Sequence, residues 1–485
     1  MAGIGFELRR LSERGLIGQV AATGHAAFVT AGPWLVTVLA LGLIQRYIVF
    51  VVTEQDAYLL QALIIYAFCL TLLVTAPLTT AAIRASADDL YERHIHRIRG
   101  NFILALTLGC LVCLGLSLPL FAFGFGLSGA DLMLASAGAG AIAMVWPSIA
   151  FASMVRAYLV ISLSFAAGLI ISVGLTLALA ARELGVGVQA AGFGAGLGLT
   201  AIALASTVIG TFPGAMPSLR QSLLHLALRA RNHGAMVCGA FLAVAAVWAD
   251  SWVVWAGPLG KAAGNGLPTA PFYDSAMFMA RLSILPGLIA FLLSVDIVVH
   301  ERSRALMATI DDNGTLAHIR RRLEAVRQAA DSSLTRLILL QAVCGAIVVL
   351  LAPAFIEQAG LRFEQLGTFR VGILGALFQA IFIAASTLVL HFGRGRIYLG
   401  LQALYLLLNL TGTAISLALP LHWLGGGYFV ASATAAVAAL AALRAVLASL
   451  DRLIFHDALI IRDASLGRRR PPHSPIAAIS KETTS

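Results

Sequence analysis

Residues 57–83 read AYLLQALIIYAFCLTLLVTAPLTTAAI and contain no charged side chain. A helix needs about 20 predominantly apolar residues to cross the roughly 30 Å hydrocarbon core of a bilayer, so this stretch predicts a membrane-spanning helix. Further stretches satisfy the same criterion: 22–44, 101–123, 131–154, 157–180, 186–212, 235–256, 274–299, 337–357, 368–391, 397–420 and 425–448. We predict an all-α polytopic membrane protein with about 12 transmembrane helices.

The composition supports this class. Hydrophobic residues make up 59% of the 485 residues and charged residues only 12%, whereas a soluble domain is about 25% charged. So little charge cannot cover a water-soluble fold of this size, which excludes a soluble enzyme, a disordered protein and a disulfide-stapled secreted domain. The net charge of +10 arises mainly from Arg residues in short runs between apolar stretches, a pattern that indicates membrane topology rather than nucleic-acid binding.

The basic residues also predict the orientation. If the N-terminus is cytoplasmic and twelve spans alternate, the inner segments hold 27 Arg and Lys residues and the outer segments hold four. Cytoplasmic loops of membrane proteins carry the excess of basic residues. We therefore predict that both termini lie in the cytoplasm.

A short basic loop after the sixth span divides the chain into two halves. The predicted segments are a cytoplasmic, interfacial N-terminus (1–21), a first six-helix lobe (22–212), the basic inter-lobe loop (213–234), a second six-helix lobe (235–448) with a cytoplasmic loop (300–336), and a cytoplasmic tail with a disordered end (449–485). No sequence repeat between the halves is evident, so an origin by duplication is only a hypothesis.

Ionisable residues inside the apolar stretches are candidates for a transport path, because a charge near the bilayer centre is costly and usually faces a cavity or a partner. Arg281 lies about two turns into its span, and Asp274 precedes it by seven residues on the same helix face, roughly 10 Å away. The other candidates have simpler explanations as well: Asp296 as a local salt-bridge partner, Arg370 as a side chain that reaches to the interface, and His25 as a structural residue.

Prolines inside apolar stretches predict helix kinks, because each removes a backbone donor and leaves a carbonyl to be satisfied in another way. Four are candidates: Pro33, Pro77, Pro147 and Pro286. Broken helices are typical of alternating-access transporters but occur in other membrane bundles too.

Tryptophans suggest two further features. Trp34 and Trp146 each adjoin a proline, and their flat rings are candidates for stacking on sugars, with core packing as the alternative. Trp248, Trp252 and Trp255 cluster at the end of the predicted span 235–256, where an interfacial aromatic belt is expected.

Motifs for catalysis are weak or absent. Gly124, Gly126 and Gly129 match G-x-G-x-x-G, but they lie in a turn between two apolar stretches rather than in a βαβ unit. No phosphate-binding G-x-x-x-x-G-K-[ST] motif is present, and the longest polar segment is too short for a nucleotide-sugar domain. We expect no catalytic residues, no cofactor and no metal site, and therefore not an enzyme.

Several motifs resemble one family along almost the whole chain. Residues 1–10 read MAGIGFELRR and 31–34 read AGPW; ILPGL (284–288), NGTL (313–316), FRVGILGALF (369–378) and GGYF (426–429) follow. Together they resemble the PelG family, the inner-membrane transport subunits for Pel exopolysaccharide of bacterial biofilms.

The resemblance implies a bacterial inner-membrane member of the multidrug/oligosaccharidyl-lipid/polysaccharide exporter superfamily, with two six-helix lobes around a central cavity. It implies transport of an amino-sugar polymer rich in N-acetylgalactosamine and its partly deacetylated form, beside PelD, PelE and the cytoplasmic glycosyltransferase PelF. We predict that Arg320, Arg321 and Arg322 help to dock that synthase.

The sequence is also compatible with three other functions. They are a flippase for lipid-linked oligosaccharide, a drug or cation antiporter of the same superfamily, and a non-transporting scaffold for a polysaccharide synthase. The sequence identifies neither a coupling ion nor an energy source.

Overall fold

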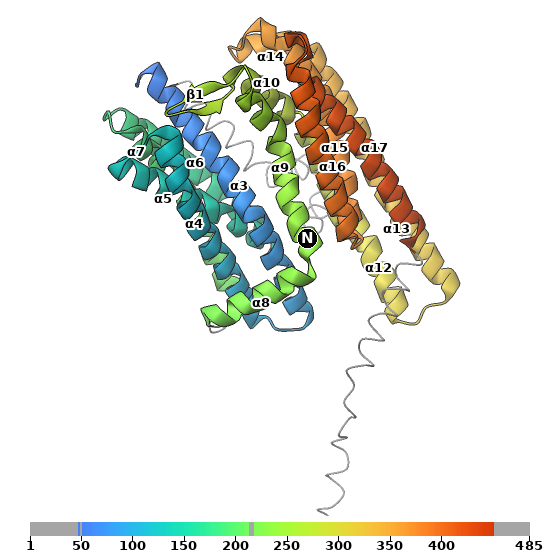
Figure 1. Cartoon of the computed structure of the whole chain (residues 1–485). Coiled ribbons are helices and arrows are strands. Elements are labelled where there is room, and N and C mark those ends of the chain that lie inside the picture. Colours follow the sequence, from blue (N-terminus) through green and yellow to red (C-terminus); the bar gives the residue numbers. More distant parts are fainter. Residues whose placement is uncertain (1–46, 49–50, 213–217, 451–485) are drawn as a thin grey trace, which may run out of the picture.

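The computed structural model describes residues 47–48, 51–212 and 218–450, and the fold is helical apart from one small hairpin within them (Figure 1). The first lobe, as we use the term for the structure, comprises α3 (Glu54–Tyr91), α4 (His96–Phe125), α5 (Gly129–Met154), α6 (Tyr158–Ala180) and α7 (Val186–Thr211). A shorter helix, α8 (Leu219–Asn232), lies across the foot of this bundle (Figure 1).

The second lobe follows α8. Its helices are α9 (Gly234–Ala256), α10 (Pro271–Leu282), α11 (Leu285–Ser294), α12 (His300–Asp311), α13 (Leu316–Leu350), α14 (Ala352–Gln358), α15 (Leu366–His391), α16 (Gly395–Leu417) and α17 (Gly426–Ala448). Short π and 3-10 turns connect some of them: Val295–Val299, Phe363–Gln365 and Leu421–Trp423. The strands β1 (Lys261–Ala263) and β2 (Leu267–Thr269) form an antiparallel hairpin between α9 and α10.

Eleven helical segments in the described part of the chain are long and apolar enough to cross a membrane, with α10 and α11 counted as one span. They correspond to eleven of the predicted spans, which confirms the all-α polytopic class. The remaining predicted span, 22–44, lies outside the described residues, as do the segments 1–21 and 451–485.

One helix begins much earlier than predicted. The span expected at 337–357 covers the second half of α13, which runs from Leu316 to Leu350, and most of α14. Most of the polar segment expected at 300–336 is therefore also helical, as α12 and the first half of α13. Leu323, Val326 and Ala330 are buried against neighbouring helices, so a helical spacing of apolar residues continues into a segment that is otherwise polar.

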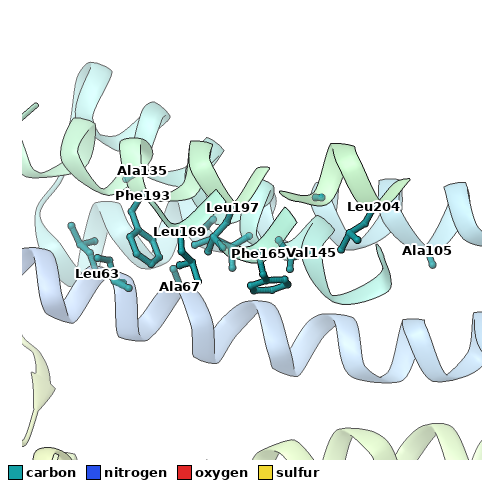
Figure 2. Close-up of a cluster of buried hydrophobic side chains, with 14 of the residues drawn as sticks. Leu63, Ala67, Ala105, Ala135, Val145, Phe165, Leu169, Phe193, Leu197 and Leu204 are labelled. Atoms are coloured by element: carbon teal, nitrogen blue, oxygen red, sulfur yellow. The ribbon is translucent and has the colours of Figure 1, made fainter. Parts of the chain in front are cut away.

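Each lobe has its own apolar interior. Figure 2 shows part of the first, where Phe165, Phe193 and Leu197 pack between α3, α6 and α7. The helices α5 and α7 approach closely because Gly138 faces Gly194: a Cβ on Gly194 would lie 2.5 Å from the Gly138 Cα atom. A separate cluster fills the second lobe, around α15, α16 and α17.

The hairpin joins the two lobes. The hairpin belongs to the loop between α9 and α10, but it also contacts α3. The Tyr58 hydroxyl of α3 donates to the Lys261 carbonyl of the hairpin at 2.8 Å. Ala263 and Leu267 of the hairpin are part of the apolar interior of the first lobe. The two lobes are therefore in contact at the hairpin end of the molecule, opposite α8 (Figure 1).

Candidate functional site

A buried ion pair lies in the second lobe. Nη2 of Arg281, in the last turn of α10, donates to Oδ2 of Asp250 on α9 at 2.5 Å. The Asp250 side chain is fully buried and that of Arg281 is 16% exposed, and both residues lie in helices apolar enough to span a membrane. Separating two such charges in a low-dielectric interior is expensive, so the pair constrains how α9 and α10 pack.

Further groups complete the shell around Asp250. The Tyr273 hydroxyl donates to Oδ2 at 2.7 Å, and Nδ2 of Asn409 on α16 contacts Oδ1 at 3.4 Å. The Arg281 guanidinium lies 5.2 Å from the centre of the Tyr428 ring on α17, a favourable cation–π contact. One carboxylate therefore connects α9, α10 and α16, and its partner Arg281 extends the network to α17.

Asp274 has a different set of partners. Its Oδ2 atom accepts hydrogen bonds from Trp255 Nε1 at 2.7 Å and from the Ala270 backbone N–H at 3.1 Å. Two polar atoms of this region, Asp274 Oδ1 and Arg281 Nε, are buried and form no hydrogen bond with the described residues. Asp274 and Arg281, both on α10, therefore retain unused hydrogen-bonding capacity.

The sequence pointed to Arg281 and Asp274 in this network and missed Asp250. Arg281 does lie within a span, but its charged partner is Asp250, which we did not single out. The same signal was present for Asp250, because it is the single charged residue within the predicted span 235–256. Trp255 is only 4% exposed and contacts Asp274, so the prediction that it belongs to a lipid-facing aromatic belt is wrong.

The helix that carries Arg281 is broken beside Pro286. Helix α10 ends at Leu282 and α11 starts at Leu285. The Gln341 side chain of α13 enters the break: its Nε2 donates to the Ser283 carbonyl at 2.6 Å, and its Oε1 accepts from the Gly287 N–H at 3.2 Å. A single amide thus replaces one backbone hydrogen bond of a continuous helix.

The other prolines predicted to kink a helix do not break one in the described residues. Helices α3 and α5 continue through Pro77 and Pro147 without a break, and Pro33 lies outside the described residues. A further proline, Pro119, lies within α4, which also continues without a break. Pro286 is the one of our four candidates at which the described structure interrupts the helix.

Among the described residues, the contacts of Trp146 do not include the Asp250–Arg281 pair. Trp146 donates from Nε1 to Thr71 Oγ1 at 3.2 Å within the first lobe, and its ring lies 6.1 Å from that of Phe68. Arg370 is exposed near the start of α15, and Asp296 belongs to the π turn after α11. Trp34 and His25 are outside the described residues.

A second charged cluster attaches α8 to the end of α3. Nη2 of Arg229 donates to both oxygens of Glu92, at 2.7 and 2.6 Å. His225 of α8 lies with Nε2 3.0 Å from Asp89 Oδ2, and His233, the C-cap of α8, lies with Nε2 3.0 Å from Asp88 Oδ2. The hydrogen bond from Arg229 lowers the pKa of Glu92 below its usual value.

Ligand atoms of Asp89, Glu92 and His94 lie within 4.8 Å of one another, which is close enough for a shared cation. Both Glu92 oxygens, however, already accept from Arg229. We therefore interpret this cluster as an ion-pair network that fixes α8 rather than as a metal site.

The predicted docking residues lie on α13. Arg320 and Arg321 are exposed, whereas Arg322 is half-buried. The first two are therefore available to a partner in the described structure.

Comparison with known proteins agrees with the fold. Residues 1–455 match the family model described as "PelG: Putative exopolysaccharide Exporter (EPS-E)". No curated protein matches the sequence.

Solved structures of similar fold are transporters. A MOP superfamily transporter from Pyrococcus furiosus is 15% identical, with a TM-score of 0.63 over 92% of this chain and 97% of that one. An outward-facing MATE family multidrug transporter is 14% identical, with a TM-score of 0.59 over 89% and 96%. A mutant of the Vibrio cholerae MATE transporter VcmN is 15% identical, with a TM-score of 0.59 over 89% and 98%. At such identities the likeness establishes the MATE-like fold alone.

Proposed function

The chain belongs to the PelG family of exopolysaccharide exporters, and from this membership we propose that it carries a Pel-type amino-sugar polysaccharide across the inner membrane to the biofilm matrix. Its eleven described spans and its fold make it a multi-pass membrane protein of transporter architecture. The family and the fold indicate a transporter rather than an enzyme.

We place the polymer path between the two lobes. The observation that supports a polar path is the Asp250–Arg281 pair of the second lobe, because charged side chains within membrane-spanning helices are costly to insert and usually face a cavity or a partner. Arg281 is partly exposed and its Nε atom is unused by the described residues, so it has capacity for a polar ligand. Asp274 supplies a second such atom on the same broken helix.

The proposed orientation puts α8, α12 and the first half of α13 on the cytoplasmic side, with both termini. The excess of basic residues on that side supports it. There, exposed Arg320 and Arg321 would meet the PelF-type glycosyltransferase, beside PelD and PelE. The two lobes correspond to the segments 22–212 and 235–448 in this proposal.

The test compares secreted with cell-retained amino-sugar polymer in a strain that lacks this protein and in the same strain with the protein restored. We expect secretion to be lost and then recovered. The Arg281→Ala variant should lower secretion more than it lowers the amount of protein in the membrane. Unchanged secretion in the deletion strain would overturn the proposal and favour a lipid-linked oligosaccharide flippase or an antiporter. Normal secretion by Arg281→Ala would remove Arg281 from the path.

A further inference from the structure

Aromatic rings from both lobes meet where α3 lies beside α9 (Figure 1). Trp255 of α9 is at the centre of this cluster. Its ring centroid is 5.0 Å from that of Tyr66, in the first lobe, and 6.1 Å from that of Trp248. Trp252 lies on the same face of α9, packs against this cluster and is half-buried, as are Tyr66 and Trp248. The contact between the lobes is therefore an aromatic surface at this level.

Hydrogen bonds hold two of the rings in place. The Tyr66 hydroxyl donates to the Pro268 carbonyl of the hairpin at 2.7 Å, and Trp255 Nε1 donates to Asp274 Oδ2 at 2.7 Å. Rings that are fixed at their polar end present their flat apolar faces in a set direction. Such preorganised faces are suited to recognise a ligand that is itself flat and apolar on one side.

One acceptor in this cluster has no donor within the described part of the chain. Asp274 Oδ2 is occupied by Trp255 and Ala270, but Asp274 Oδ1 is buried and forms no hydrogen bond with the described residues. Leaving a buried carboxylate oxygen unpaired is unfavourable. The structure thus combines an unused anionic acceptor with aromatic faces at the boundary between the lobes.

We propose that Asp274, Tyr66, Trp248 and Trp252 form an amino-sugar subsite on the transport path, which deepens the proposed function and rests on it. The C–H groups on one face of a pyranose pack against an aromatic ring. A C2 ammonium group or N-acetyl N–H donates to Asp274 Oδ1, and a charge-assisted bond of this kind is stronger than one between neutral groups. The sugar reaches this oxygen when the lobes separate along α3 and α9.

The experiment measures binding of three fluorescently labelled hexasaccharides to the full-length protein in lipid nanodiscs. The probes are 1,4-linked oligomers of galactosamine, N-acetylgalactosamine and galactose, which share one linkage and differ only at C2. We expect the galactosamine oligomer to bind about tenfold more tightly than the galactose oligomer, because a site built around an acceptor discriminates against a ligand that lacks the matching donor. This comparison needs no variant, so it tests the acceptor even if substitutions at Asp274 prevent folding.

Variants then assign the roles. Asp274→Asn keeps an oxygen for Trp255 and Ala270 but removes the charge, and it should abolish the preference for galactosamine. Trp248→Ala should weaken binding of all three probes, whereas Trp248→Phe should restore most of it. Phe241→Ala is the matched control, because Phe241 is exposed on α9 at 44% and lies outside the cluster.

Three results would overturn the subsite: no binding of any probe, equal binding of the galactosamine and galactose oligomers, or Trp248→Ala behaving like Phe241→Ala. The polymer-secretion assay separates these results from failure of the proposed function. A protein that restores secretion but shows no preference at C2 keeps its function and loses this subsite, while a deletion strain that still secretes polymer refutes the function itself.

Discussion

Asp250 on α9 and Arg281 on α10 form a 2.5 Å ion pair inside the membrane-spanning part of the second lobe. Asp250→Ala removes the partner of a buried guanidinium and should lower the unfolding free energy by about 3–5 kcal/mol. Combining Asp250→Leu with Arg281→Met removes both charges and should lower the unfolding free energy clearly less than Asp250→Ala does. Thermal unfolding of the two purified variants in detergent compares their stabilities. If the double variant is at least as unstable as Asp250→Ala, the pair is not the source of the effect.

The break between α10 and α11 gives a second prediction. Gln341→Met leaves the Ser283 carbonyl and the Gly287 N–H without their partner, and each unpaired buried group costs about 1–3 kcal/mol. Gln402→Met is the matched control, since Gln402 is also buried but contacts Ser386 at 3.4 Å and lies at no helix break. We expect a clearly lower melting temperature for the first variant. Equal melting temperatures would show that the Gln341 amide does not support the break.

These two features were unequally accessible from sequence. Pro286 predicted the break, and Arg281 was evident as a charge in an apolar stretch. The role of Gln341 was not evident, because a neutral amide hardly changes the hydropathy of its span and its partners lie 54 and 58 residues away. Asp250 carried a detectable signal, but its pairing with Arg281 depends on how α9 packs against α10, which periodicity does not report.

The spans were more predictable than the segments between them, because 20 apolar residues are sufficient to specify a membrane helix whatever packs around it. Helix α13 shows the limit of that argument. Its first half is polar enough to resemble a loop, and burial of Leu323 and Val326 against a neighbouring helix accounts for its structure. The error at Trp255 has a related cause, since an aromatic residue at a span end can face either lipid or another helix.

The attachment of α8 to α3 should depend on pH. Arg229 lowers the pKa of Glu92, so the ionised carboxylate stabilises the folded state above the pKa that Glu92 has in the unfolded chain, about 4.3. This contribution is lost as pH falls through the lower pKa of the folded state. Glu92→Gln should therefore lower the melting temperature at pH 7 but have progressively less effect below about pH 4. A difference between the two proteins that is independent of pH would contradict the ion-pair explanation.

The hairpin contact between the lobes predicts a modest effect of a single hydroxyl. Tyr58→Phe removes the hydrogen bond to the Lys261 carbonyl and the 2.6 Å contact with Thr269 Oγ1, while the ring remains. We expect a loss of about 0.5–1.5 kcal/mol for each net hydrogen bond. Limited proteolysis of the hairpin, beside a melting curve, detects whether it has separated from α3. Unchanged protection would mean that the hydrogen bond from Tyr66 to the Pro268 carbonyl and the apolar packing of Leu267 are sufficient to hold it.

The last prediction concerns the partner surface on α13. Arg320→Glu combined with Arg321→Glu reverses two exposed charges and leaves half-buried Arg322 in place, so insertion and folding should be retained. Co-purification with the glycosyltransferase should fall about tenfold, which corresponds to roughly 1.4 kcal/mol of binding free energy. Arg302→Glu with Arg304→Glu makes the same charge change on exposed positions of α12 and should have little effect. If the two double variants lower recovery equally, the synthase responds to total charge and not to this surface. If neither double variant lowers recovery, the docking site lies elsewhere.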